Sequence, residues 1–345
     1  MSQSTARPAR PAAPAVCVLA TGLGLCSALA AAETTLYGGV RLGLDYVDVK
    51  TTGQSNWDVI NETSRFGIKG SEDLGGLTTI WQFEFGVPAD GSGSAAITKR
   101  LSWVGLKGSL GTVAIGRQWT PYFLATSLDD VFNSDDTSVS YYFLGLPHRW
   151  DDMISYTSPD WGGFSLAGAF VLNGAGNGLD GAQAKQDGVD AWDIAAIYRQ
   201  GPLVLGAAYQ RYGSAGVDGN TQFPAGSTQW GLAASYRLGD VNLIGAWHQA
   251  HLNDARDSKP SVYGLTGEYF IGPTHVVRAG YGHYDPDAAS GKDYDQYKLG
   301  YQYNFSKRTR TWIEYSHFDY RSPGAKVAAI GQEYDNVQIG IRHDF

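Results

Sequence analysis

Apolar and polar residues alternate along most of this chain after residue 33. In "TLYGGVRLGLDY" the apolar side chains of Leu36, Val40 and Leu44 share one parity, and Arg41 and Asp45 share the other. Successive side chains of a β-strand point to opposite faces of the sheet. This period of two therefore predicts strands that have one apolar face and one polar face.

The same pattern recurs to the end of the chain, for example in "WGLAASYRL", "YKLGYQYNF" and "VQIGIRHDF". No amphipathic helix of comparable clarity competes with these segments. Together they predict sixteen strands at about residues 35–47, 57–70, 77–87, 98–108, 112–118, 151–158, 163–173, 189–199, 202–212, 228–239, 241–252, 260–270, 274–285, 293–305, 309–320 and 333–345.

The connections between these segments alternate in length. Short turns such as "GSLG", "QGP" and "SKRT" alternate with longer loops rich in Gly and Asp. This sorting is typical of an antiparallel transmembrane β-barrel of the outer membrane, in which the short turns face the periplasm and the long loops face outward. A closed barrel leaves no unpaired strand edge in the lipid. A soluble sandwich is the alternative, but its loops would not be expected to sort by length.

The stretch "NETSRFGIKGSEDLGGL" carries charge on one face of a predicted strand. Arg65 and Lys69 share one parity, while Phe66 and Ile68 share the other. In a membrane barrel the apolar face meets lipid and the polar face meets water inside. The barrel interpretation therefore places Arg65 and Lys69 in an aqueous lumen, which a barrel of sixteen strands is wide enough to contain.

Residues 1–32 have the features of a cleaved secretory signal. Arg7 and Arg10 precede an apolar run, and the segment ends in the small residues of "SALAAAE" that a signal peptidase reads. A permanent membrane anchor is the alternative, but glycines interrupt the run. The predicted organisation is a signal peptide at 1–32 and a transmembrane barrel domain at 33–345.

Composition agrees with an exported barrel. Removing residues 1–32 leaves 313 residues, and it removes Cys17 and Cys26, the two cysteines of the chain. An exported chain without disulfides needs a large core or a closed network of backbone hydrogen bonds. The remaining 24 Lys and Arg against 34 Asp and Glu give a formal charge of −10, which argues against a nucleic-acid partner.

Four ordered motifs, "SRFGIKGSEDLGG", "WVGLKGSLGTVAIGR", "ISYTSPDWGG" and "GIRHDF", resemble the general-diffusion porins of Gram-negative bacteria, in particular the neisserial and beta-proteobacterial branch. The resemblance runs the length of the mature chain. It implies a passive outer-membrane channel for small hydrophilic solutes and ions, not an enzyme. It also implies a homotrimer of sixteen-stranded barrels, set in outer-membrane lipid and lipopolysaccharide, with no cofactor and with the third loop of each barrel folded inward.

Residues 119–148 resemble the constriction loop of that family. They form a connection too long for a routine hairpin and contain no Lys or Arg. An ordinary extracellular loop with solvated acids is the alternative. If the loop folds inward, its acidic residues are expected at the constriction: Asp129, Asp130, Asp135 and Asp136.

In the related porins, basic residues line the wall opposite the inward loop. Matching motif by motif carries this role to Arg65 in "SRFG", Arg100 before "LSWVGLKG" and Arg149 ahead of "ISYTSP". Arg117, at the end of "AIGR", is a further candidate, although its parity matches the apolar face of its strand. A basic wall that faces an acidic loop implies moderate anion selectivity.

Three other features of the sequence do not support a different function. "GNGLDG" fits a dinucleotide-binding pattern, but no helix pattern follows it. His248 and His251 lack the spacing of a zinc site, so no metal is expected. A receptor barrel with a plug needs about 22 strands, for which the mature chain is too short.

The chain ends on an aromatic residue, Phe345, at the lipid-facing parity of the last predicted strand. In related barrels a terminal aromatic residue is read by the outer-membrane insertion machinery. The resemblance therefore assigns Phe345 the role of a C-terminal assembly signal.

Overall fold

The structure, a computed structural model, describes residues 33–50, 52–92, 97–134, 137–172, 188–213, 217, 223–287, 293–320 and 333–345. The predicted signal peptide lies outside these residues. The elements, in chain order, are β1 (Glu33–Val49), β2 (Gln54–Asn61), β3 (Arg65–Asp73), β4 (Thr78–Gly86), β5 (Thr98–Gly108), β6 (Gly111–Trp119), α1 (Pro121–Thr126), the 3₁₀ helix η1 (Tyr141–Leu144), β7 (Arg149–Thr157), β8 (Phe164–Val171), β9 (Ala191–Gln200), β10 (Leu203–Tyr212), β11 (Thr228–Leu238), β12 (Val241–His251), β13 (Ser261–Ile271), β14 (His275–Asp285), β15 (Tyr294–Asn304), β16 (Thr309–Tyr320) and β17 (Tyr334–Asp344).

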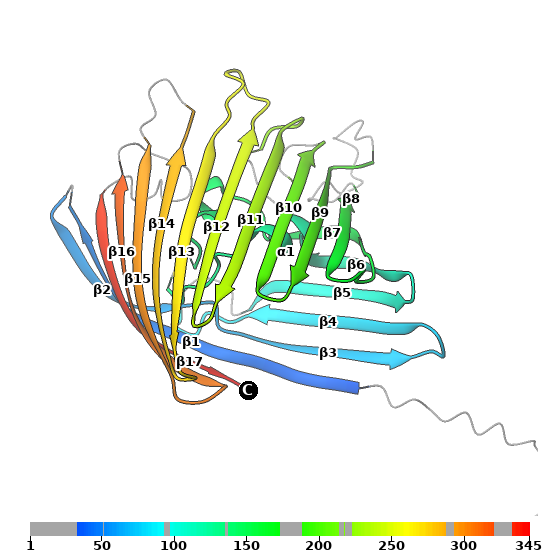
Figure 1. The fold of residues 1–345 in the computed structure, drawn as a ribbon, viewed down its shortest axis with the longest axis horizontal. Helices are drawn as coiled ribbons and strands as arrows, with labels where there is room; N and C mark the ends of the chain where they lie inside the picture. Colours follow the sequence, from blue (N-terminus) through cyan, green and yellow to red (C-terminus); the bar gives the residue numbers. More distant parts are fainter. Residues whose placement is uncertain are drawn as a thin grey trace, which may run out of the picture. The chain divides into compact units, whose positions relative to one another are not determined.

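Sixteen of these strands close into a barrel, which confirms the predicted fold (Figure 1). From β3 to β17, each strand pairs antiparallel with the next one along the chain. Strand β1 then pairs with β17 on one edge and with β3 on the other, which completes the ring. A closed sheet satisfies the backbone hydrogen bonds without help from water, as a lipid environment requires.

The predicted strand 57–70 was wrong in one respect, because the structure divides it into β2 and β3. Thr63, between them, has a φ of 60°, in the left-handed region that an extended strand does not use. Ser64 fixes the bend, because its Oγ accepts from the Arg41 backbone N–H at 2.8 Å and donates to the Arg41 carbonyl at 3.1 Å. Strand β2 pairs with β1 outside the closed ring, and the bend turns Glu62 into the barrel, where its side chain is buried.

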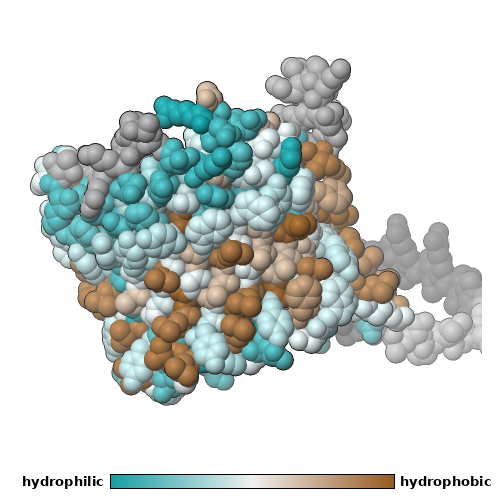
Figure 2. All heavy atoms as spheres, turned by 45° about the horizontal axis from the view of Figure 1, so that its top comes forward, coloured by the Kyte–Doolittle hydropathy of each residue, from teal (hydrophilic) through white to brown (hydrophobic). Residues whose placement is uncertain are grey.

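The outer face of the barrel is apolar. Many large apolar side chains at the outward parity are exposed, among them Leu36, Val40, Leu44, Ile68, Phe83, Val104, Ile115, Leu232, Leu243, Leu265, Leu299 and Ile339. Soluble monomers rarely expose apolar patches larger than a few hundred Å². Figure 2 shows hydrophilic side chains around the long loops and hydrophobic ones over much of the sheet below, as a lipid-facing surface requires.

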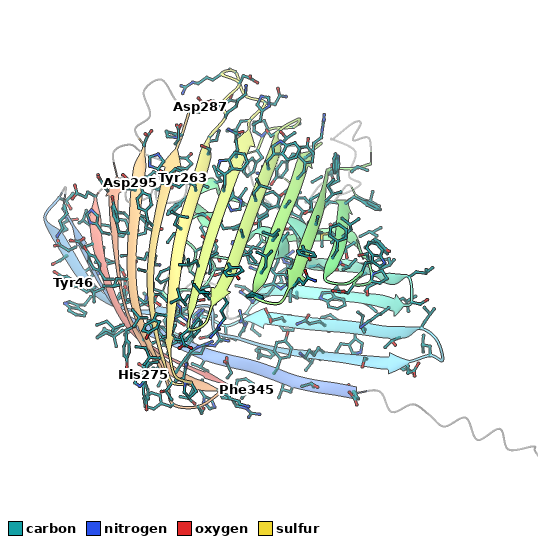
Figure 3. All side chains as sticks on the ribbon, in the orientation of Figure 1. Tyr46, Tyr263, His275, Asp287, Asp295 and Phe345 are labelled. Carbon is teal, nitrogen blue, oxygen red and sulfur yellow. The ribbon has the colours of Figure 1, made fainter. Side chains whose placement is uncertain are left out.

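Aromatic residues lie toward both ends of this surface (Figure 3). Near the long loops, Tyr46 packs on Trp57 of β2 with ring centroids 4.8 Å apart. At the opposite end, His275 packs on Tyr303 at 5.2 Å, and Tyr303 packs on Phe305 at 4.9 Å. Such girdles mark the two membrane–water interfaces of outer-membrane barrels.

The connection between β6 and β7, which we call the constriction loop (residues 120–148), folds into the barrel. Its helix α1 begins at Thr120, whose Oγ1 accepts from the Phe123 backbone N–H at 3.1 Å, and Pro121 takes the first helical position. The loop aromatics Tyr122 and Tyr141 are fully buried, so the main apolar cluster of the protein lies inside the barrel. No helix in the described part of the chain is long and apolar enough to span a membrane.

Two glycines let the loop backbone reach the barrel wall. A Cβ added to Gly206 of β10 would lie 1.8 Å from the Ala125 carbonyl oxygen. One added to Gly282 of β14 would lie 1.9 Å from the Val139 carbonyl oxygen. Since no side chain fits at either position, these glycines determine how closely the loop packs against the wall.

Candidate pore constriction

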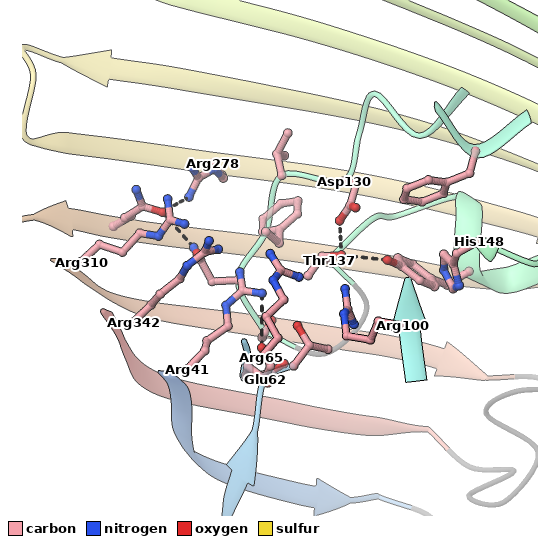
Figure 4. A pocket seen from close by; sticks show the side chains of 18 of the residues that line it. Arg41, Glu62, Arg65, Arg100, Asp130, Thr137, His148, Arg278, Arg310 and Arg342 are labelled. Atoms are coloured by element: carbon pink, nitrogen blue, oxygen red, sulfur yellow. Dashed lines mark hydrogen bonds between the residues drawn. The ribbon is translucent and has the colours of Figure 1, made fainter. Parts of the chain in front are cut away.

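A cavity of about 480 Å³ lies in the lumen between the constriction loop and the opposite wall (Figure 4). The described residues that line it include two carboxylates, Glu62 and Asp130. They also include seven arginines, which we call the arginine wall: Arg41, Arg65, Arg100, Arg149, Arg278, Arg310 and Arg342. Positive charge therefore dominates this section of the lumen.

The predicted residues Arg65 and Arg100 both line the cavity, and they share a carboxylate. In the pairing of β4 with β5, Glu84 lies opposite Leu101 and Phe85 lies opposite Lys99, so Arg100 is the extra residue of a β-bulge. A bulge re-aims the side chain that it carries. The Arg100 Nε donates to Glu84 at 2.6 Å, and the Arg65 Nε lies 4.0 Å from the same carboxylate.

The third predicted arginine, Arg149, is held by an aromatic stack. It begins β7 opposite Trp119, and its guanidinium lies 4.4 Å from the centre of the Trp119 ring. Trp119 in turn stacks on Phe123 of α1, with ring centroids 4.8 Å apart. A cation–π contact positions a guanidinium without neutralising its charge. Arg149 therefore keeps its positive charge at the base of the loop.

Four arginines of the wall were not among the predicted site residues. Arg41 of β1 lies directly opposite Arg342 of β17, and Arg342 lies directly opposite Arg310 of β16. Like charges directly opposite each other destabilise a sheet, so this row calls for a functional explanation. The fourth, Arg278 of β14, donates through Nε to Glu268 at 2.9 Å.

The sequence contains a partial signal for the row formed by Arg41, Arg342 and Arg310. Arg41 and Arg342 both fall on the polar face of their predicted strands. Their proximity follows only from the pairing of the first strand with the last, because that pairing brings the two residues together from opposite ends of the chain. A search for lumen-facing arginines in the pair of strands that closes the barrel would have found both.

The structure places Arg117 beside the cavity, and it is not among the residues that line it. The pairing of β6 with β7 shifts register between Gly116 and Gln118, so strict alternation does not continue through Arg117. Its Nη1 lies 3.1 Å from a carboxylate oxygen of Asp151. This ion pair holds Arg117 at the barrel wall.

Of the predicted acids, Asp130 lines the cavity. Its carboxylate accepts a hydrogen bond from the hydroxyl of Thr137, which belongs to the same loop. The side chain is exposed to the lumen, but the surrounding protein removes much of its hydration, which raises the pKa of the Asp130 carboxyl above its usual range. Figure 4 shows Asp130 and Thr137 facing arginines from several strands.

The structure places Asp129 differently from the prediction. Its side chain is fully buried inside the loop, where one carboxylate oxygen accepts from the Ser138 and Ser140 hydroxyls, each at 2.7 Å. Burial raises the pKa of this carboxyl. Asp129 therefore braces the loop and does not face the cavity. Asp135 and Asp136 lie outside the described residues.

The histidine considered as a metal ligand has another role. His248 of β12 is fully buried behind the constriction loop, and its Nδ1 lies 3.0 Å from the Tyr122 hydroxyl. In the ranges that the structure describes, no cluster of three or more His, Cys, Asp or Glu could hold a metal ion. The motif "GNGLDG" lies outside the described residues.

Fold and site together define a water-filled diffusion channel of the outer membrane. The chain matches the family described as Gram-negative porin over residues 15–323, and it belongs to that family. The chain is therefore an outer-membrane porin that passes small hydrophilic solutes.

Individual relatives agree. Outer membrane porin protein 32 of Delftia acidovorans is 28% identical, over 92% of this chain and 96% of its own. Major outer membrane protein P.IA of Neisseria meningitidis serogroup B is 29% identical, over 82% of this chain and 81% of its own. Among solved structures, the anion-selective porin from Comamonas acidovorans superimposes with a TM-score of 0.73 at 24% identity, over 91% of this chain and all of that one.

Proposed function

We propose that this porin is a passive channel with a moderate preference for anions and without catalytic activity. The observation that carries the proposal is the excess of arginines over carboxylates around the lumen cavity, seven against two. The formal charge of the mature chain is negative, but solvent-exposed charges are screened over about 8 Å at physiological ionic strength. The charges around the cavity therefore act on a passing ion more strongly than those of the outer loops.

Partial neutralisation limits the preference. Arg100, Arg278 and Arg342 each donate to a carboxylate, at 2.6, 2.9 and 2.7 Å. Asp130 faces the arginine wall from the loop, so the field across the cavity orients polar solutes as well as attracting anions. Cations are disfavoured in such a pore, not excluded.

Reversal potentials in a potassium chloride gradient across a planar bilayer test this proposal. The wild-type pore should prefer chloride, and the triple variant R65Q/R100Q/R149Q should shift the reversal potential toward potassium. The triple variant R41Q/R310Q/R342Q should shift it in the same direction. Arg117→Gln is the control, because Arg117 is paired with Asp151 and does not line the cavity. It should shift the reversal potential less than either triple variant. A wild-type preference for potassium, or unchanged reversal potentials in both triple variants, would refute the proposal.

We further propose that the mature protein is a homotrimer of residues 33–345, set in outer-membrane lipid and lipopolysaccharide after cleavage of residues 1–32. Family membership supports this assembly, and one solved neighbour, OmpT of Vibrio cholerae, is described in a trimer form. Unheated protein should run as an oligomer on a denaturing gel, and heated protein as a monomer whose N-terminus is Glu33. A strictly monomeric mass in mild detergent contradicts the trimer.

We also propose that Phe345 acts as the C-terminal assembly signal. Its backbone N–H donates to the Gly38 carbonyl at 3.0 Å and its carbonyl accepts from the Gly38 N–H at 3.3 Å, at the seam where the last strand meets the first. Deleting Phe345 should lower the amount of inserted barrel while export to the periplasm continues. Phe345→Trp is the control that keeps an aromatic end. Unchanged surface levels after the deletion count against the assignment.

A further inference from the structure

The same short pattern occurs in two neighbouring hairpins of the barrel. Strand β14 contains "YGHYD" at residues 281–285, and β16 contains "YSHFD" at residues 315–319. The strands that follow them, β15 and β17, begin with "YDQ" and "YDN". Each hairpin therefore brings together a Tyr, a His and an Asp in the same order.

In the first hairpin, the Tyr and the His bind one carboxylate oxygen of the Asp. His283 lies directly opposite Asp295 in the pairing of β14 with β15, and its Nδ1 lies 2.8 Å from Asp295 Oδ1. The Tyr281 hydroxyl, from the diagonal position, donates to the same oxygen at 2.7 Å. A second carboxylate, that of Asp293, lies 3.8 Å from His283 Nε2. The Asp295 carboxylate therefore fixes the orientation of both the imidazole and the phenol.

The second hairpin has the same geometry. The Tyr315 hydroxyl donates to Asp335 Oδ1 at 2.7 Å, and His317 Nδ1 lies 2.8 Å from the same oxygen. The other Asp335 oxygen lies 2.7 Å from the Lys50 ammonium, which also donates to Asp48 at 2.7 Å. We call the two sets of three residues the Tyr–His–Asp clusters.

Both clusters lie on the outer face of the barrel, at the end that carries the long loops, where Figure 3 shows Asp295 and Tyr263. The Tyr263 ring packs on the imidazole of the first cluster, with ring centroids 5.1 Å apart. Tyr297 lies between the clusters, 5.2 Å from the phenol ring of the first and 6.1 Å from the imidazole of the second. Tyr263 and Tyr297 are exposed, so they join the two clusters into one surface, which we call the Tyr–His–Asp surface.

The outer face of β9, β10 and β11 has a different composition near the same end. There Tyr209 packs on Trp192 and on Trp230, with ring centroids 5.3 and 4.5 Å apart. These three side chains carry no charge, as expected of an aromatic girdle at a membrane interface. Charged groups on the lipid-facing side of a barrel destabilise it by an amount that depends on depth, so the carboxylates of the Tyr–His–Asp surface call for a polar partner.

The hydrogen bonds of the clusters determine where their protons lie. An ionised carboxylate can only accept, so the histidine Nδ1 and the tyrosine hydroxyl both donate to it. In the neutral imidazole Nε2 is then an acceptor, and the tyrosine oxygen keeps lone pairs that accept. The two imidazole side chains are 23% and 27% exposed, so a partner can reach them. A phosphate group, which is itself a negative acceptor, does not match this surface, whereas the hydroxyl groups of a saccharide can donate to it.

We propose that the Tyr–His–Asp surface is a docking surface for the saccharide of lipopolysaccharide. The long loops of an outer-membrane barrel face outward, so this end of the barrel lies among the head groups of the outer leaflet. The tyrosine rings offer apolar faces to a sugar ring, and their hydroxyls lie on the wet side of the interface. Two acceptor clusters on adjacent hairpins suit a ligand with several sugar units. The inference rests on the proposed setting in lipopolysaccharide and requires neither ion selectivity nor a trimer.

Binding of purified lipopolysaccharide, composed of lipid A and core saccharide, to the porin refolded without lipid tests this inference. The amount that stays bound during gel filtration in mild detergent is measured. Y281F/Y315F removes two hydroxyls, and H283F/H317F removes the imidazole nitrogens and keeps an aromatic ring. Each double variant should retain several-fold less lipopolysaccharide than wild type, and either one carries the test if the other does not fold. Tyr209→Phe is the matched control, because it removes a hydroxyl from the uncharged aromatic group, and it should retain the wild-type amount.

Phosphatidylglycerol, an anionic lipid without a saccharide, is the comparison ligand, and its retention should be the same in all variants. The proposal is overturned if the double variants retain as much lipopolysaccharide as wild type, or if they lose both lipids equally. Loss of wild-type retention in EDTA overturns it too, since a bridging divalent cation would then make the contact. Dissociation of the oligomer in the double variants would assign the surface to contact between copies of the chain. A wild-type barrel that retains no lipopolysaccharide refutes the proposed setting itself, whereas unaffected variants refute only the docking surface.

Discussion

The inner surface of this barrel has two parts that differ in chemistry although they belong to one sheet. The covered wall, on β9–β13, carries small residues where the loop lies, such as Ala195, Gly206 and Ala250. The arginine wall carries long cations around the cavity. Both parts have the same alternation and the same inward parity. The two parts differ in what lies against them. The constriction loop packs on the covered wall, and the cavity lies against the arginine wall.

Two polar residues of the covered wall, Asp193 and His248, bind the constriction loop. The Tyr122 backbone N–H donates to Asp193 at 3.2 Å, and the Tyr122 hydroxyl lies 3.0 Å from His248. Burial raises the pKa of the Tyr122 hydroxyl well above its usual range, so it stays protonated. An inward-facing polar residue is therefore not by itself a pore residue in this barrel.

The largest expected effect comes from adding a side chain to the covered wall. Gly206→Val places a Cβ 1.8 Å from the Ala125 carbonyl oxygen, far inside van der Waals contact, so α1 must leave the wall. Such overpacking costs about 1–3 kcal/mol, and we expect a lower dissociation temperature of the unheated oligomer together with altered conductance. Gly267→Val is the control, since its Cβ would meet only a Leu243 methyl at 3.9 Å. Equal behaviour of the two variants would show that the covered wall does not seat the loop.

A smaller effect is expected from pH. The Asp130 carboxyl has its pKa raised above the ordinary 3.8 by desolvation, so it becomes neutral in moderate acid, before an ordinary Asp does. Loss of this negative charge removes one of the two carboxylates that line the cavity together with the arginine wall. The chloride preference should therefore rise as pH falls toward the raised pKa, and it should fall again on return to neutral pH.

The comparison that isolates Asp130 uses Asp130→Asn. This variant should show the stronger chloride preference already at neutral pH, with little further change in acid. His148 also lines the cavity and can gain a proton, so the reversal potentials are measured in a His148→Gln background. A pH response that survives Asp130→Asn would assign the titration to another group.

The smallest expected effect is on stability at the arginine wall. Arg41 lies directly opposite Arg342, and Arg41→Gln removes this like-charge contact. Relief of the repulsion should stabilise the barrel by about 0.2–1 kcal/mol while the chloride preference decreases. Thermal dissociation and reversal potential are measured on the same sample. Arg308→Gln, in the exposed turn before β16, is the control, and lower stability of Arg41→Gln would contradict the repulsion.

Much of the fold could be predicted from the amino-acid sequence. Alternation is a local property of an extended backbone, so it revealed the strands and their two faces without knowledge of any distant contact. Loop lengths are local too, and they indicated the closed barrel and the position of the constriction loop. The motifs located Arg65, Arg100 and Arg149, which all line the cavity.

Other features depended on contacts between distant residues. The row Arg41, Arg342 and Arg310 exists because the first strand pairs with the last. The break at Thr63 is fixed by hydrogen bonds between Ser64 and Arg41. Neither is visible in a pattern of neighbouring residues.

The neighbours Asp129 and Asp130 show this limit most clearly. Both are acids of the same loop, yet Asp129 is buried against Ser138 and Ser140 while Asp130 lines the cavity. A loop has no repeating geometry, so its side-chain directions follow from how it packs against the wall. The sequence by itself determined that acids and arginines are present in the right segments. Tertiary packing decided which of them meet water, because glycines on the covered wall and the hydrogen bond from Ser134 of the loop to Glu314 of β16 set the place of the loop.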